Sequence, residues 1–210
     1  MRVILASTSP RRRDLLCLLN IPFELDTPIF EERIVPGRTA KELVEQFARG
    51  KAASVAQHNP EAIVLASDTL IQLDGEVLRK PEDLPEARAV LRRMGGREHL
   101  VQTAVALCCV ARRWELTEVA TARVWMKPFD AEAHERYLAT GDSLGKAGAY
   151  SIQGPGCELI ERLDGDFTTV VGLPLRLAAN LLAQGGVKVP IDVDALYVSK
   201  PYGNWARFHS

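Results

Sequence analysis

Short apolar runs bounded by turn-forming residues predict several strands in this chain. Strand signals of typical length cover residues 3–6, 23–26, 63–66 and 70–73, and all except 23–26 are rich in Val, Ile or Leu. The last run leads into Asp74-Gly75, a dipeptide that favours a tight hairpin turn, and a partner strand at Val77 and Leu78. Two longer strands are expected from His99 to Ala111 and from Leu116 to Met126.

Apolar residues at three- and four-residue spacing predict the helices. They recur over residues 43–55, 87–94, 131–139 and 174–182. A further helix is expected to begin at Pro10, with Ser9 as its N-cap, and to end near Asn20. Because helices and strands do not alternate strictly and a hairpin is present, we expect a mixed α/β fold with a mixed sheet.

The segment Ser7-Thr-Ser-Pro-Arg-Arg-Arg13 places three arginines in the first turn of that predicted helix. The N-terminus of a helix already carries partial positive charge, so this cluster is unfavourable unless an anion lies there. The segment therefore suggests a phosphate site. A transit peptide and a solvated helix face are the alternatives that the segment alone leaves open.

Composition indicates an ordinary globular protein of 210 residues, 47% hydrophobic and 25% charged. Its 26 basic and 27 acidic residues nearly cancel, which disfavours nucleic acid or a membrane surface as partner and favours a small molecule held by a local cluster. The four cysteines lack Cys-x-x-Cys spacing and no signal peptide is recognised, which disfavours a zinc site and favours the cytoplasm. No apolar run approaches the ~20 residues of a membrane helix.

One domain is expected to cover residues 1–187, followed by a C-terminal extension at 188–210. The extension lacks periodicity, and its Trp205 and Phe208 suggest either a docked segment or a frayed end.

Ser67-Asp68-Thr69 lies between two apolar runs that predict separate strand segments. We expect Asp68 at or near a strand end and partly desolvated, where a carboxylate is costly unless it is paired or binds a metal. A turn or cap aspartate explains the same pattern, and the sequence leaves both open.

Basic residues in apolar or turn-like contexts form a second set of candidates. Lys51, Lys80, Lys146 and the cluster Arg11–Arg13 are each more often solvated side chains, but together they match the charge of a triphosphate. Glycines between 145 and 156 would let the backbone approach such a ligand closely. Glu31 and Glu32 could hold a divalent cation together with Asp68.

Read together, these segments resemble the Maf family of nucleoside triphosphate pyrophosphatases. The ordered match covers residues 1 to about 185 and comprises Ala6-Ser-Thr-Ser-Pro-Arg-Arg12, Glu31-Glu32, Lys51-Ala52, Ser67-Asp-Thr69, Lys80-Pro81, Gly145-Lys-Ala-Gly-Ala-Tyr-Ser-Ile-Gln-Gly154 and Val170-Val-Gly-Leu-Pro174. The resemblance implies two lobes around a central cleft, as in inosine triphosphate pyrophosphatases, and a homodimer.

The same resemblance implies metal-assisted hydrolysis of a nucleoside triphosphate to the monophosphate and pyrophosphate. Asp68 is the implied catalytic carboxylate, as general base or as metal ligand, and the implied metal set is Glu31, Glu32 and Asp68, with Mg²⁺ or Mn²⁺ as the ion. The implied phosphate-binding residues are Ser7, Ser9, Arg12, Lys51, Lys80 and Lys146. Such chemistry needs charge neutralisation and an oriented water.

Arg11, Thr69 and Gln153 stand where the resemblance implies substrate specificity, and they match the branch that acts on dTTP and UTP. The amide of Gln153 offers both a donor and an acceptor to a pyrimidine. Departures from the family pattern are Gly145, where an acidic residue is common, and Asp166 and Thr169. The alternatives are a 7-methyl-GTP pyrophosphatase and a non-hydrolytic nucleotide-binding regulator of cell division or septum formation.

Overall fold

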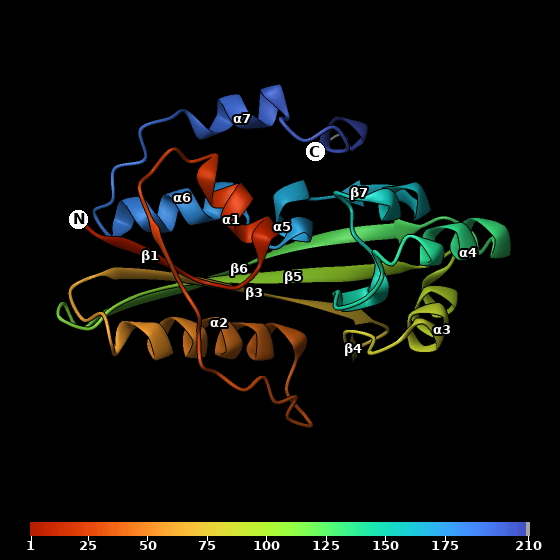
Figure 1. Ribbon diagram of the computed structural model, residues 1–210, viewed down its shortest axis with the longest axis horizontal. Coiled ribbons are helices and arrows are strands. Elements are labelled where there is room, and N and C mark those ends of the chain that lie inside the picture. The colour runs from red at the N-terminus through yellow and green to blue at the C-terminus, as the bar shows by residue number, and fades with distance from the viewer. Residues whose placement is uncertain (209–210) are drawn as a thin grey trace. The chain divides into compact units, whose positions relative to one another are not determined.

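The computed structural model describes residues 1–208 and shows a mixed α/β protein (Figure 1). The strands are β1 (Val3–Ala6), β2 (Glu24–Asp26), β3 (Ile63–Leu73), β4 (Glu76–Leu78), β5 (Glu98–Cys109), β6 (Trp114–Met126) and β7 (Ile160–Asp164). The α-helices are α1 (Pro10–Cys17), α2 (Ala40–Ala56), α3 (Leu84–Met94), α4 (Ala131–Ala139), α5 (Phe167–Val171), α6 (Leu175–Gln184) and α7 (Val193–Ser199). Three short 3₁₀ helices are η1 (Ala147–Ala149), η2 (Pro155–Leu159) and η3 (Trp205–Arg207).

The strands form one mixed sheet in the order β2-β1-β3-β5-β6-β7, with β4 paired to β3. β1 runs parallel to both β2 and β3, whereas the pairs β3–β4 and β6–β7 are antiparallel. The predicted mixed sheet is therefore confirmed. The hairpin at Asp74-Gly75 is confirmed as well, because both residues adopt positive φ angles of 49° and 85°, as a tight hairpin turn requires.

The chain divides into two compact units, each assembled from three segments. The first unit contains residues 1–69, 103–120 and 172–199, and the second contains residues 70–102, 121–171 and 200–210. Residues 188–199 of the C-terminal extension belong to the first unit, and its described residues from 200 to 208 belong to the second.

In the first unit, α2 lies on one side of the strands, and α1 and α6 lie on the other (Figure 1). The buried strand β1 between these helices explains the four-residue apolar run at its position. α2 begins with a capping box, in which the Thr39 hydroxyl accepts from the Glu42 N–H and the Glu42 carboxylate accepts from the Thr39 N–H. A fixed start and a buried apolar face set the rotation of α2 and hence the direction of each of its side chains.

Several sequence predictions about the elements need correction. Residues 63–66 and 70–73 are not separate strand segments, because β3 continues through Ser67-Asp68-Thr69. α1 ends at Cys17 rather than near Asn20. α5, α7 and β7 were not predicted, since each is short and has little periodicity of its own.

The second unit buries a histidine and a tyrosine that bond to each other. His99 Nε2 lies 2.8 Å from the Tyr150 hydroxyl, and the His99 side chain is 2% exposed. Burial lowers the pKa of His99 from 6.5 to about 4 and raises the pKa of Tyr150. His99 is therefore neutral in the folded protein at neutral pH and ties β5 to the glycine-rich segment that contains Tyr150.

No helix within residues 1–208 is both long enough and apolar enough to cross a membrane.

Stability is expected to fall as the pH falls from 6.5 to about 4, because the unfolded chain binds a proton at His99 in this range and the folded chain does not. The contribution of His99 is at most about 3 kcal/mol. Urea unfolding at several pH values, for the native chain and for His99→Gln, measures it. The variant should lose this part of the pH dependence, and parallel pH profiles for the two proteins would contradict the assignment.

Candidate active site

Asp68 lies in the middle of β3, and the residue is 2% exposed. Its Oδ1 accepts a hydrogen bond from Lys51 Nζ, which extends from α2 and is itself buried. The same Nζ lies 2.5 Å from Glu32 Oε1, so one ammonium group bridges two carboxylates. Because these groups are largely removed from water, the electrostatic attraction between them is stronger than at the surface. Loss of one partner would leave the other charge buried and unpaired.

The second oxygen of Asp68, Oδ2, is buried and has no hydrogen-bond partner within the described residues. A buried acceptor without a partner costs free energy. At a carboxylate whose other oxygen is already fixed, this oxygen is suited to accept a proton from water or to bind a cation.

Glu32 reaches Lys51 because Phe30 packs directly on α2. The Phe30 ring centroid lies 6.1 Å from that of Phe47, and a Cβ atom at Gly50 would lie 2.1 Å from the Phe30 ring. Only glycine at position 50 leaves space for this ring. The sequence prediction did not include Gly50, although a glycine one position before Lys51 in an otherwise regular helical pattern is the signal for such a close approach.

The structure does not bring the predicted metal set together as a trio. Glu32 and Asp68 meet at Lys51, whereas Glu31 is exposed and pairs with Arg33 at 2.6 Å. No group of three or more His, Cys, Asp or Glu side chains is arranged for a metal ion within residues 1–208. The oxygen donors that do meet, Glu32 and Asp68, are of the hard type that Mg²⁺ and Mn²⁺ prefer. These ions also take ligands from phosphate and water, so two carboxylates fit such an ion.

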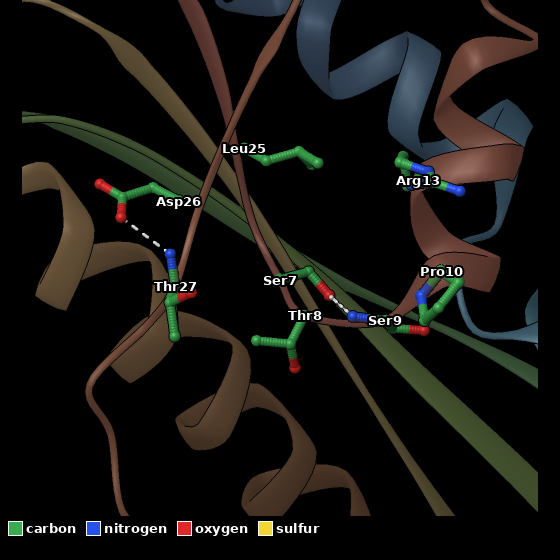
Figure 2. A pocket seen from close by; sticks show the side chains of 8 residues that line it. All are labelled: Ser7, Thr8, Ser9, Pro10, Arg13, Leu25, Asp26 and Thr27. Atoms are coloured by element: carbon green, nitrogen blue, oxygen red, sulfur yellow. Dashed lines mark hydrogen bonds between the residues drawn. The ribbon is translucent and has the colours of Figure 1, made fainter.

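The arginine segment follows β1 as predicted, with Ser9 as the N-cap and Pro10 as the first residue of α1. The Ser9 side chain makes no capping bond, and the Ser9 N–H instead donates to Ser7 Oγ at 3.1 Å. A pocket of ≈ 240 Å³ opens here, and Figure 2 shows its lining. The residues that line it are Ser7, Thr8, Ser9, Pro10, Arg13, Leu25, Asp26 and Thr27.

The three arginines have different surroundings. Arg13 is exposed and lies 3.2 Å from Asp14, and Arg11 is half-buried. Arg12 turns inward, where its Nε donates to the Gly172 carbonyl at 3.0 Å and its Nη2 to Thr69 Oγ1 at 3.3 Å. Desolvation lowers the pKa of Arg12, and the charges of Asp68 and Glu32 act in the opposite direction.

A buried hydrogen-bond network holds Arg12 in this position. The Thr69 hydroxyl also lies 3.0 Å from that of Thr103, a fully buried residue of β5. The Gly172 carbonyl accepts a second bond, from Ser67 Oγ at 2.8 Å. Gly172 has a φ of 119°, and a Cβ there would lie 3.3 Å from Thr69 Oγ1, so the close approach requires glycine.

Thr103 and Gly172 were absent from the predicted site residues. Thr103 is a hydroxyl within the apolar run from Val101 to Leu107, which is the kind of signal that marked Asp68. Gly172 lies in the segment Val170–Pro174 on which the family resemblance rested, but no role was assigned to it.

The remaining predicted residues belong to the second unit. Lys80 is exposed and follows β4. Lys146 Nζ contacts Asp142 through the carbonyl at 2.5 Å and through Oδ1 at 3.0 Å. Asp142 thus supplies an acidic partner to Lys146, which Gly145, at a position where an acidic residue is common in the family, does not. Gln153 is half-buried and lies two residues before the start of η2.

Comparison with known proteins matches most of this chain to one protein family and to proteins that share one name. The family model for Maf-like protein matches residues 2–185. A protein of Pelotomaculum thermopropionicum named dTTP/UTP pyrophosphatase is 42% identical over 187 residues, which cover 89% of this chain and 98% of that protein. Proteins of the same name from Symbiobacterium thermophilum and Myxococcus xanthus are each 43% identical over 188 residues, which cover 90% of this chain and 96% and 94% of theirs.

Among solved structures, the crystal structure of a nucleoside-triphosphatase, or dITP/XTP pyrophosphatase, from Mycobacterium abscessus has a TM-score of 0.43 and 19% identity, and the match covers 62% of this chain and 77% of that one.

Thr103→Val is expected to weaken the binding of inorganic triphosphate about 3- to 10-fold, because the Thr69 hydroxyl loses a buried partner and no longer orients Arg12. Calorimetric titration at fixed ionic strength measures the change. Thr103→Ser keeps the hydroxyl and should bind like the native chain. Equal affinities for Val and Ser at position 103 would show that Arg12 does not depend on this network.

Proposed function

Because this chain belongs to the family of Maf-like proteins, we propose that it is a nucleoside triphosphate pyrophosphatase that hydrolyses dTTP and UTP to the monophosphate and pyrophosphate. The observation that carries this proposal is the buried Asp68. One of its oxygens is fixed by Lys51, and the other has no hydrogen-bond partner within the described residues.

In the proposed mechanism, Lys51 lies against Oδ1 of Asp68 and fixes that oxygen. Oδ2 then accepts the hydrogen bond of the attacking water and takes up its proton. Lys51 limits the rotation of the carboxylate, so Oδ2 keeps one direction through the reaction. This fixed direction lowers the reorganisation that the charge-separated transition state requires.

In the alternative role of Asp68, as a metal ligand in place of a general base, a divalent cation, Mg²⁺ or Mn²⁺, would be held by Asp68 and Glu32. When bound, the ion supplies positive charge to the phosphate oxygens and polarises a water. Glu31, which pairs with Arg33, is left out of the ligand set.

Phosphate binding is assigned to Arg12 and to the segment from Ser7 to Ser9, and the resemblance to the family assigns it to Lys80 and Lys146 as well. Arg12 has five N–H donors and uses Nε and Nη2 within the protein. Its guanidinium is thereby held in one orientation before the ligand arrives, which reduces the entropy that binding costs.

Base selection is assigned to Gln153 and Arg11. The Thr69 hydroxyl contacts Arg12 and Thr103, so in this account Thr69 positions the phosphate clamp rather than contacting the base. Gln153 presents both a donor and an acceptor, which complement the imide edge shared by thymine and uracil.

We further propose a cytoplasmic location, which suits the thiols of Cys17, Cys108, Cys109 and Cys157, and a homodimeric assembly.

We expect dTTP and UTP to be hydrolysed with kcat/KM at least about 10-fold above that for ATP, GTP and 7-methyl-GTP. A purine would leave polar groups of the site unpaired, at about 1–3 kcal/mol for each group. Loss of each triphosphate in the presence of Mg²⁺ is followed by chromatography.

The variant that tests the mechanism is Asp68→Asn, which keeps the shape of the side chain and removes its charge. It should lower kcat at least about 100-fold, while Glu32 still pairs with Lys51 and the variant remains folded. Turnover near the native rate in this variant, or 7-methyl-GTP as the best substrate of the native chain, would contradict the proposal.

A further inference from the structure

The last part of the C-terminal extension, from residue 200 onward, belongs to the second unit, although residues beyond 185 lie outside the family match. Trp205 is fully buried and stacks on Phe167 of α5 with ring centroids 5.3 Å apart, and Phe208 stacks on the same ring at 6.2 Å. Lys200 Nζ donates to the Phe208 carbonyl at 3.0 Å, which closes the segment on itself. Aromatic burial of this size anchors the segment firmly.

Asn204 lies next to this aromatic anchor and contacts the backbone around Gln153. Its side-chain nitrogen donates to the Gln153 carbonyl at 2.8 Å and approaches the carbonyls of Ile152 and Gly154 at 3.3 and 3.2 Å. Three consecutive carbonyls thus converge on one amide group, which supplies a hydrogen-bond donor to a segment outside the helices and strands.

Other contacts also restrict this backbone segment. A Cβ at Gly154 would lie 2.7 Å from Asp142 Oδ2, so a larger residue at this position would displace the carboxylate. Upstream, Tyr150 is held by His99. Asn204 therefore helps to fix the backbone of Gln153. The side chain of Gln153 takes no part in these hydrogen bonds.

We infer that Asn204 is a positioning residue for Gln153, so that the C-terminal extension of this chain tunes the pyrimidine preference of the site. This inference rests on the proposed function, because it takes Gln153 as the residue that selects the base. An amide selects between bases only when its donor and acceptor are directed correctly, and small displacements of the supporting backbone weaken such selection.

The test compares selectivity, defined as kcat/KM for dTTP divided by kcat/KM for GTP. Asn204→Ala should lower this ratio about 3- to 10-fold, as expected for the loss of a hydrogen-bonded support. A defect in overall stability would lower both rate constants together and leave the ratio unchanged. Asn204→Asp keeps the shape, removes the donor and should act in the same direction.

The control is Arg207→Ala, in the same segment. Arg207 pairs with Glu158 at 2.5 Å on the surface, and its loss should leave the ratio within about twofold of the native value. In a Gln153→Ala background, Asn204→Ala should change the ratio no further, because two residues that act through one group are not additive.

Unchanged selectivity in both Asn204 variants, or full additivity with Gln153→Ala, would overturn the inference. The inference would also be overturned if Gln153→Ala itself left the ratio unchanged. In that case, hydrolysis of dTTP by the native chain would still support the proposed function. If the native chain hydrolysed neither dTTP nor UTP, the proposed function would fail. Hydrogen exchange at the Gly154 amide would then decide the positioning, with faster exchange in Asn204→Ala supporting it and equal exchange overturning it.

Discussion

The contact between Lys51 and two carboxylates, Asp68 and Glu32, is the constraint on which the rest of the candidate site depends. A charge buried in the middle of a strand is tolerated only when a partner is brought to it. The buried face of α2 brings the lysine, and Phe30 against Gly50 brings the second carboxylate. With Arg12 nearby, two cations offset two carboxylates, and each of these residues comes from a different part of the chain.

Much of the fold could be predicted from the sequence, because local patterns are sufficient for hairpins and amphipathic helices. The Asp74-Gly75 turn and the helix 131–139 were predicted in this way. The continuity of β3 was not predicted, because Ser67-Asp68-Thr69 has the composition of a turn. Its strand conformation comes from tertiary partners, among them Lys51 and the Gly172 carbonyl, that lie far away in sequence.

In the candidate site, too, some residues could be predicted from local sequence and others only from tertiary contacts. Residue types with unusual local context, such as Asp68 and Arg12, were recognised. Thr103, Gly172 and Asn204 were missed, because a threonine in a strand or an asparagine in an aperiodic segment is ordinary until its partners are known. Their roles follow from contacts across 34 to 160 positions of sequence.

The central claim is that this chain cleaves the bond between the α- and β-phosphates, and phosphorus NMR of dTTP incubated with the native protein and Mg²⁺ tests it most directly. The account predicts dTMP and pyrophosphate in equal amounts. Appearance of dTDP with inorganic phosphate instead would mean cleavage between the β- and γ-phosphates and would contradict the account.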